Sequence, residues 1–313
     1  MDEDYLPAYN LSNTLSRVIP RLAPTTGVFV HYCSLAAFYS IIESRKIRYT
    51  SALSTNDPSE FLLGSSIVNE CVRTTLPGIL RGARLARSLQ PIHLERRFRA
   101  FVFCMTEAVD DEADVGDLSQ WRLYGADGRG VGLVFDASET ATSELLSRLG
   151  SIPRRIVYGE DEGRRLVEEV IQDYLRDFEA LPESTKAYLE RDPVGLNKAN
   201  YLQNTVFWLP SVIKHRAYRH EREVRLVRGD IGDHVGNPLI FPDRAGLKRP
   251  TVECAIGELD GPPESRWTRS PIRKVIIGPS GDQSAIEDSI RYFMEAHSWT
   301  LEIGRSDIPY RAL

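Results

Sequence analysis

The chain has few cysteines, and their spacing matches neither a metal-binding motif nor a disulfide pattern. Its 313 residues include four cysteines, at positions 33, 71, 104 and 254, and none of them forms a CxxC pair. Structural zinc sites usually take their ligands in closely spaced pairs, and small secreted domains carry dense disulfides. The sequence therefore predicts neither a zinc site nor a disulfide framework.

Long apolar runs are also missing. No apolar stretch approaches the ~18 residues that a transmembrane helix needs, and the acidic start MDEDYLPAYN lacks the apolar core of a signal peptide. The net charge is −5, from 39 Lys and Arg against 44 Asp and Glu, which argues against nonspecific binding to duplex DNA. We expect a cytoplasmic protein with no membrane attachment.

Several catalytic signatures are absent as well. The glycine-rich turn at 125–130 lacks the GK[ST] ending of a P-loop, and a strand follows it, which excludes a Rossmann fingerprint. There is no GxSxG and no HExxH motif. His215 and His220 lie five apart with no third ligand nearby. The sequence predicts no metal site.

What is present predicts an α+β fold. Segments rich in β-formers do not alternate regularly with helical ones and are not dense in hairpins, which favours the α+β class. We expect a mixed, mainly antiparallel sheet with flanking helices. We expect one domain over 1–313, with a helical lead-in at 1–26 and a helical insertion at 160–215. The expected strands cover 27–33, 100–105, 131–135, 155–158, 221–227, 238–241, 250–256, 272–277 and 301–303.

A pair of glutamates forms the first candidate site. Residues two apart in an extended strand share a face, so Glu221, Glu223 and Arg225 point one way. Val224 and Leu226 point the other way, with Arg222, and are expected to enter the core. Like charges raise the pKa of one carboxyl group, and the arginine lowers that of the other. Such a pair can stabilise a developing cation. The alternative is a solvated strand face with an ordinary Glu–Arg pair.

Histidine and aromatic residues give further candidates. His31 lies in an apolar strand, where it is either a core residue hydrogen-bonded to a backbone carbonyl or a group that orients a sugar or an amide. Trp121 and Tyr124, three apart on a short helix, are either core anchors or a stacking platform.

The ordered set of motifs is similar to a bacterial family known as domain of unknown function 2971. The resemblance spans nearly the whole chain, and its least constrained part is 160–215. The usual aromatic residue before the arginine of the E-x-E-aromatic-R segment is Val224 here. The family name implies no activity. The matching stretches are HYCSLAAFYSIIESRKIRYTS (31–51), NDPSE (56–60), FVFCMTE (101–107), WRLYG and GVGLVFD (121–136), YRHEREVRL (218–226), IRKVIIGP (272–279) and RSDIPYR (305–311).

A looser resemblance does imply chemistry. A strand ending in His-Tyr, a helix and then a short basic strand resemble the opening of the ADP-ribosyltransferase fold, which has a split sheet. In those enzymes a histidine holds the NAD ribose, an aromatic residue stacks on nicotinamide, and a glutamate stabilises an oxocarbenium-like transition state. The resemblance gives these roles to His31, Tyr49 and Glu223, with Glu221 as second member of the E-x-E pair. Further candidates for binding the nucleotide are Tyr32, Ser51, Asn56, Trp121, Tyr124 and Arg225.

These resemblances imply an ADP-ribosyltransferase-like or NAD-glycohydrolase-like enzyme with NAD as its substrate. A protein or a nucleic acid would be the acceptor, and a bacterial toxin or antiphage effector the biological role. One alternative is a non-enzymatic sensor of a nucleotide or of a protein partner. Another is a metal-dependent nuclease that uses Asp57, Glu60 and Glu223. Asp57 and Glu60 also suit the N-cap and the capping-box position of a helix.

Overall fold

The computed structural model describes most of the chain. The predicted lead-in before residue 21, the 185–207 part of the predicted insertion, and the candidates Asn56 and Asp57 lie outside the described residues. Those residues are 21–55, 59–75, 100–137, 152–180, 182–184, 208–229, 239–242, 248–256 and 270–311.

Helices and strands are mixed along the chain, as an α+β protein requires. The helices are α2 (Leu35–Ser44), α3 (Ser59–Thr75), α6 (Glu112–Val115), α7 (Leu118–Leu123), α9 (Glu160–Glu179) and α13 (Gln283–Ala296), with 3-10 turns η1 (Ala52–Ser54), η2 (Leu209–Val212) and η3 (Arg216–Glu221). The strands are β1 (Val28–Cys33), β2 (Lys46–Ser51), β3 (Ala100–Glu107), β4 (Val131–Asp136), β5 (Arg154–Arg155), β6 (Val157–Tyr158), β7 (Ile213–Lys214), β8 (Glu223–Gly229), β9 (Leu239–Pro242), β10 (Lys248–Ala255), β11 (Ile272–Ile277) and β12 (Glu302–Arg305).

The main sheet confirms the predicted architecture. Its strand order is β12-β11-β4-β1-β3-β2-β10-β9, with β8 paired to β3 and β5 paired to β8. The strand pairs are antiparallel except for β11 and β12, which are parallel. Strands β6 and β7 form a separate parallel pair. The sheet is therefore mixed and mainly antiparallel.

Strand β3 changes its partner along one edge. Near its end, Thr106 pairs with Val30 of β1. Near its start, Val102 pairs with Thr50 of β2. The other edge of β3 pairs with β8 along its length. Strands β1 and β2 therefore separate from each other along β3, and residues 103–105 lie between the two paired stretches.

The first strand and helix form as the sequence predicts. Ser34 follows β1 in an extended conformation, and its side chain accepts a hydrogen bond from the backbone N–H of Ala37 at 3.2 Å, as an N-cap does. Arg45 ends the helix with a left-handed φ of 58°. Phe38 and Ile42, four apart, are fully buried against the sheet, which holds β1 and β2 at either end of α2.

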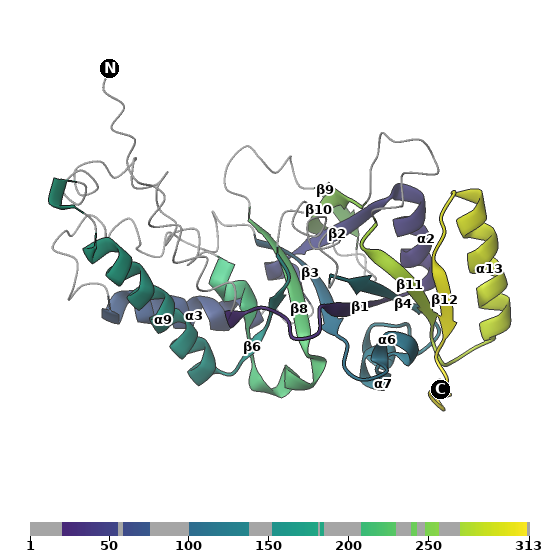
Figure 1. Ribbon diagram of the computed structural model, residues 1–313, viewed down its shortest axis with the longest axis horizontal. Coiled ribbons are helices and arrows are strands. Elements are labelled where there is room, and N and C mark those ends of the chain that lie inside the picture. The colour runs from purple at the N-terminus through teal and green to yellow at the C-terminus, as the bar shows by residue number, and fades with distance from the viewer. Residues whose placement is uncertain are drawn as a thin grey trace, which may run out of the picture.

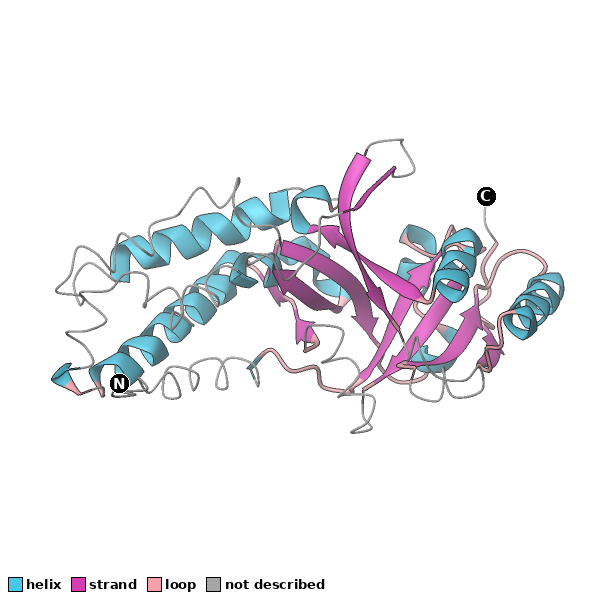
Figure 2. Ribbon diagram, turned by 90° about the horizontal axis from the view of Figure 1, so that it is seen from above, coloured by secondary structure: helices cyan, strands magenta, loops and turns pink. Residues whose placement is uncertain are grey.

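The helices cover the two faces of the sheet unevenly (Figures 1 and 2). Helices α2 and α13 pack over one face, where Phe101, Phe103 and Leu226 are buried. On the other face, α3 and α9 build one apolar cluster with η2. A second cluster on that face is built around Trp121 of α7. Polar strand residues occupy the sheet surface between these two clusters, and that is where the candidate site lies.

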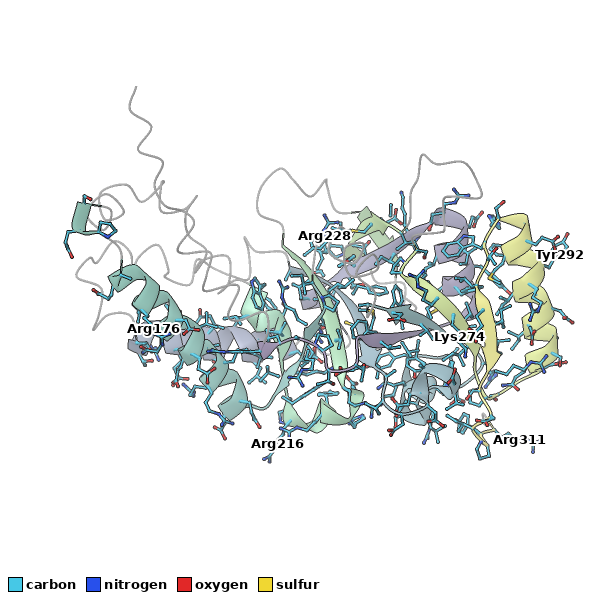
Figure 3. All side chains as sticks on the ribbon, in the orientation of Figure 1. Arg176, Arg216, Arg228, Lys274, Tyr292 and Arg311 are labelled. Atoms are coloured by element: carbon cyan, nitrogen blue, oxygen red, sulfur yellow. The ribbon has the colours of Figure 1, made fainter. Side chains whose placement is uncertain are left out.

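Helix α13 has one buried face and one exposed face. Ile290 and Met294 are buried against the sheet, whereas Tyr292 is 78% exposed and projects away from it (Figure 3). This alternation is the amphipathic pattern of a surface helix.

Several predicted strands differ from the observed ones by one or two residues at their ends, and three segments differ in kind. The strand expected at 221–227 begins at Glu223, because Arg222 adopts a left-handed φ of 43° and Glu221 ends η3. The strand expected at 155–158 is divided into β5 and β6, which pair with different partners. The insertion expected to be helical does contain α9, but it also contains β7.

Candidate functional site

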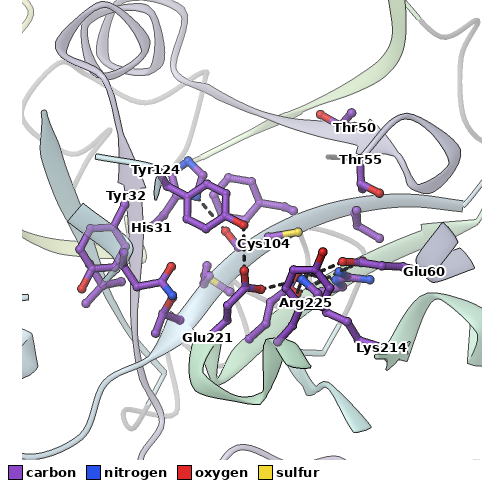
Figure 4. Close-up of a pocket in the computed structure, with 18 of the residues that line it drawn as sticks. His31, Tyr32, Thr50, Thr55, Glu60, Cys104, Tyr124, Lys214, Glu221 and Arg225 are labelled. Carbon is purple, nitrogen blue, oxygen red and sulfur yellow. Dashed lines mark hydrogen bonds and ion pairs between the residues drawn. The ribbon is translucent and has the colours of Figure 1, made fainter. Parts of the chain in front are cut away.

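A cavity of about 300 Å³ opens beside the point where β1 and β2 separate (Figure 4). Strands β1, β2, β3 and β8 form its floor, and side chains from α3, α7, β7 and η3 form its walls. The lining residues are Val30, His31, Tyr32, Arg48, Thr50, Ser54, Thr55, Glu60, Val102, Phe103, Cys104, Met105, Thr106, Gln120, Tyr124, Lys214, Tyr218, Glu221, Glu223 and Arg225.

Alternate side chains of β8 face the cavity. Val224 and Leu226 are fully buried in the core under α2 and α13, so Glu223 and Arg225 point to the opposite face. Cys104 lies opposite Arg225 in the β3–β8 pairing and lines the same cavity. The predicted direction of the Glu223–Arg225 face is therefore correct.

Two cations bind three glutamates on the charged wall. Lys214 donates to Oε2 of Glu221 at 2.6 Å and to Oε2 of Glu223 at 3.0 Å, and it lies 2.8 Å from Oε1 of Glu60. Arg225 donates from Nε to Oε1 of Glu223 at 2.6 Å and from Nη2 to Oε2 of Glu223 at 2.9 Å. Its Nη2 also donates to Glu60 at 2.7 Å. Glu60, Lys214, Glu221, Glu223 and Arg225 form what we call the charged network.

The charged network is buried, and its charges do not cancel. Each of its side chains belongs to a residue that is at most 7% exposed, which contradicts the alternative of a solvated strand face. Three carboxylates against two cations leave one net negative charge when all five groups are ionised. Burial alone would raise the pKa of Glu223, but Arg225 and Lys214 outweigh it and hold that pKa at about 2. Burial alone would lower the pKa of Lys214, but Glu223 and the other carboxylates raise it.

His31 contacts Cys104, the residue of β3 that pairs with Arg225. Its Nδ1 lies 2.8 Å from the backbone carbonyl oxygen of Cys104, and because a carbonyl only accepts, Nδ1 carries the proton. Its ring stacks on Phe103 with the ring centroids 4.4 Å apart. Burial lowers the pKa of His31, so the ring is neutral at pH 7 and Nε2 is a hydrogen-bond acceptor.

Tyrosines complete the walls. Tyr124 donates its hydroxyl hydrogen to Oε1 of Glu221 at 3.0 Å, and burial raises the pKa of Tyr124, so the phenol stays protonated. The ring of Tyr218 lies 4.5 Å from Nζ of Lys214, a cation–π contact. Tyr32 accepts a hydrogen bond from the backbone N–H of Asp117 at 2.8 Å.

Six of the predicted site residues meet in this cavity. They are His31, Tyr32, Tyr124, Glu221, Glu223 and Arg225. Glu221 arrives from the end of η3 and not from the strand that was predicted to carry it.

Three other predicted site residues do not line the cavity. Tyr49 is fully buried in the core under α2, because on β2 it is Arg48 and Thr50 that face the cavity. Ser51 is 7% exposed and pairs with Phe101 in the sheet. Trp121 is fully buried, and its indole N–H donates to the carbonyl of Val115 at 3.1 Å. Trp121 is therefore a core anchor, and the stacking role predicted for Tyr49 is wrong.

Two residues that shape the site, Lys214 and Gln120, were not predicted from the sequence. Lys214 lies in a segment that was expected to be helical, and only its place on β7 beside η3 brings it to the glutamates. Gln120 precedes the tryptophan of α7 and carries no recognisable motif. The position of Lys214 directly after the apolar pair Val212-Ile213 is the one local signal that could have identified it.

Two of the three metal ligands of the nuclease hypothesis are bound to cations. Glu60 and Glu223 do meet, but Arg225 and Lys214 lie between them and bind their oxygens. No three His, Cys, Asp or Glu side chains of the described residues are arranged to hold a metal ion. Asp57, the third proposed ligand, lies outside those residues.

Comparison with known proteins finds a match to one family model, over about a third of the chain, and no activity. Residues 120–226 match the model of a family described as Protein of unknown function (DUF2971). This segment includes the cavity residues Gln120, Tyr124, Lys214 and Glu223, whereas His31 lies before it. Neither the curated proteins nor the solved structures that were compared with the chain contain a match. Among the described helices, none is long and apolar enough to cross a membrane.

Proposed function

We propose that this chain, whose residues 120–226 match the DUF2971 family model, is an ADP-ribosyltransferase-like or NAD-glycohydrolase-like enzyme that cleaves the bond between nicotinamide and ribose in NAD. One observation carries the proposal. His31, Tyr124, Glu221 and Glu223, which come from four different elements, line a single cavity where the sheet separates. That cleavage needs a group to hold the ribose, a flat surface for nicotinamide and a carboxylate for the developing charge.

Glu223 would supply the electrostatic part of the reaction. When the bond from the ribose C1′ to the nicotinamide nitrogen breaks, its electron pair leaves with nicotinamide and positive charge develops on the ribose. A carboxylate fixed in place before the reaction stabilises that charge without the cost of reorganisation. Arg225 and Lys214 fix Glu223 and keep it ionised. Water or an acceptor nucleophile then adds to C1′ and loses a proton.

His31 and Tyr124 would position the substrate. The Nε2 of neutral His31 can accept a hydrogen bond from a ribose hydroxyl, because Nδ1 is bonded to Cys104. Tyr124 takes the stacking role that Tyr49 cannot fill, because its ring lines the cavity. A cavity of about 300 Å³ is at the lower end of ligand pockets, so it would take the nicotinamide riboside half of NAD, with the adenosine half across its opening.

A non-enzymatic sensor is the second candidate. Both carboxylate oxygens of Glu223 are already bound by Arg225 and Lys214. A carboxylate whose two oxygens are both hydrogen-bonded within the protein suits a rigid site that binds a nucleotide without cleaving it. The same cavity serves both candidates, and turnover separates them.

The experiment mixes the purified protein with NAD and follows the release of nicotinamide and ADP-ribose by chromatography. The enzyme hypothesis predicts release above the spontaneous rate. Thermal unfolding with NAD, ADP-ribose, ATP and cyclic nucleotides belongs beside it, because a bound ligand at about 100 times its Kd stabilises the fold by ~2.7 kcal/mol. Stabilisation by one of these nucleotides without any release of nicotinamide favours the sensor.

The biological role follows from this chemistry. An enzyme that consumes NAD or modifies a protein or a nucleic acid suits a bacterial toxin or antiphage effector acting in the cytoplasm, and we include that role in the proposal. Induced expression in a bacterial host tests it: the wild-type chain should slow growth and deplete NAD, whereas Glu223→Gln should not. Normal growth with full NAD levels would contradict it.

A further inference from the structure

Gln120 carries a buried hydrogen-bond donor with no acceptor. The residue is 2% exposed and lines the cavity. Its side-chain Nε2 has no hydrogen-bond partner in the part of the chain that the structure describes. Most buried polar groups in folded proteins are hydrogen-bonded, and leaving one unpaired is destabilising. A buried, unpaired donor on a residue that lines a cavity indicates that a ligand could supply the missing acceptor.

The position of Gln120 ties it to the charged network. Gln120 and Tyr124 are four residues apart at α7, and the backbone N–H of Tyr124 donates to the carbonyl of Gln120 at 2.9 Å. Side chains at this spacing lie one above the other on the same side of a helix. Tyr124 in turn contacts Glu221. The unpaired donor therefore stands about one helical turn from a wall that carries a net negative charge.

We propose that the side-chain amide of Gln120 recognises the ligand by donating a hydrogen bond to an uncharged carbonyl oxygen, so that the cavity accepts a carboxamide and rejects the corresponding carboxylate. The amide donor alone would bind either group. The net negative charge of the charged network makes the difference, because a carboxylate placed near it meets a like charge in a site of low dielectric.

The inference rests on the proposed function for the identity of the ligand. Nicotinamide carries a carboxamide, and nicotinic acid carries a carboxylate in its place. NAD and nicotinic acid adenine dinucleotide differ in the same single group. These two pairs of compounds are therefore the probes, the small pair for recognition alone and the dinucleotide pair for the whole substrate.

Gln120→Met is the test variant, and Gln283→Met is its matched control. Methionine keeps the length of the side chain and removes the donor. The Nε2 of Gln283 donates to the carbonyl oxygens of Gly278 at 3.0 Å and Ser306 at 2.7 Å, so its loss should lower the melting temperature. Gln120→Met should leave the melting temperature of the ligand-free protein unchanged or raise it. A fall for Gln120→Met as large as that for Gln283→Met would overturn the inference, because it would show that the amide is paired within the fold.

Calorimetric binding measurements complete the experiment. We expect the wild-type chain to bind nicotinamide at least about tenfold more tightly than nicotinic acid, the ratio that one hydrogen bond or one repelled charge produces. Gln120→Met should weaken nicotinamide binding by about the same factor and remove most of the discrimination. NAD and its acid analogue should follow the same order.

The outcomes separate the inference from the proposed function. If nicotinamide binds through Gln120 but NAD is not cleaved, the inference stands and the enzyme proposal falls. If NAD is cleaved while Gln120→Met binds and discriminates like the wild type, the enzyme proposal stands and the inference falls. If the chain neither binds nicotinamide nor cleaves NAD, both are wrong.

Discussion

The Nδ1 of His31 lies 2.8 Å from the backbone carbonyl oxygen of Cys104, at the place where β3 has left β2 and has not yet met β1. The histidine thus satisfies a carbonyl that sits between the two paired stretches of the strand. The same hydrogen bond fixes which ring nitrogen carries the proton. One interaction therefore supports the separation of the sheet and prepares His31 for a ligand.

The first prediction concerns stability at low pH. Burial lowers the pKa of His31 in the fold below its ordinary 6.5, so below about pH 6.5 the unfolded chain binds more protons than the folded one. The contribution of neutral His31 is complete above that pH and is lost as the pH falls. His31→Gln should lose less free energy of unfolding than the wild type between about pH 7.5 and pH 5.5, as measured by urea unfolding.

The exposed Leu62, which does not titrate, provides the control. Leu62→Gln should show the same pH dependence as the wild type. Equal pH dependence in the wild type and His31→Gln would mean that His31 titrates alike in the folded and unfolded chains.

The second prediction tests the coupling inside the charged network. Lys214→Met removes a cation that binds three carboxylates, and breaking a buried pair in this way costs ~3–5 kcal/mol of unfolding free energy. Glu221→Gln removes the excess negative charge. Because the two side chains are 2.6 Å apart, the double variant should be more stable than the sum of the single changes predicts, by ~0.5–3 kcal/mol.

Chemical denaturation of the four proteins completes this double-mutant cycle. Arg291→Met, whose side chain is 60% exposed and pairs with Glu287 on α13, should change stability by less than about 1 kcal/mol. Strict additivity of Lys214→Met and Glu221→Gln would show that the network is not coupled.

The third prediction isolates the hydroxyl of Tyr124. Tyr124→Phe keeps the ring but leaves Oε1 of Glu221 without this donor, and an unsatisfied buried acceptor costs ~1–3 kcal/mol. Tyr39→Phe is the matched control, because its hydroxyl lies 2.8 Å from Oγ of Ser289 at a more exposed place. Thermal unfolding should show the larger loss for Tyr124→Phe. Equal losses would mean that the Tyr124–Glu221 bond is no better sheltered from water than the control.

The fold was largely predictable because local signals agree with it. Ser34 caps a helix whose apolar residues recur at helical spacing, and the β-rich segment before it forms a strand. The predicted start of a strand was wrong where one backbone angle determines it. The left-handed φ of Arg222 separates Glu221 from the strand. A positive φ is uncommon for arginine, so the residue type does not predict this conformation.

The site was predictable only in part, because alternation says which residues share a face but not which face lines a cavity. The spacing of Glu223 and Arg225 sufficed, since Val224 between them is apolar. On β2, Tyr49 was chosen although its neighbours are the ones that face the cavity. Lys214 and Gln120 reach the site through tertiary contacts between segments that carry no motif.

The most direct measurement is the rate of nicotinamide release from NAD by the wild type and by Glu223→Gln, expressed per folded molecule. Expressing it this way matters because Glu223 is part of a buried ion-pair network, so the variant loses some stability as well. Glu287→Gln, which alters another paired carboxylate on α13, should release nicotinamide at the wild-type rate. We predict clear release by the wild type and a rate ~10²–10³-fold lower for Glu223→Gln, the usual effect of removing one preorganised electrostatic group. Release at the spontaneous rate by the wild type, or equal release by folded Glu223→Gln, would contradict the account.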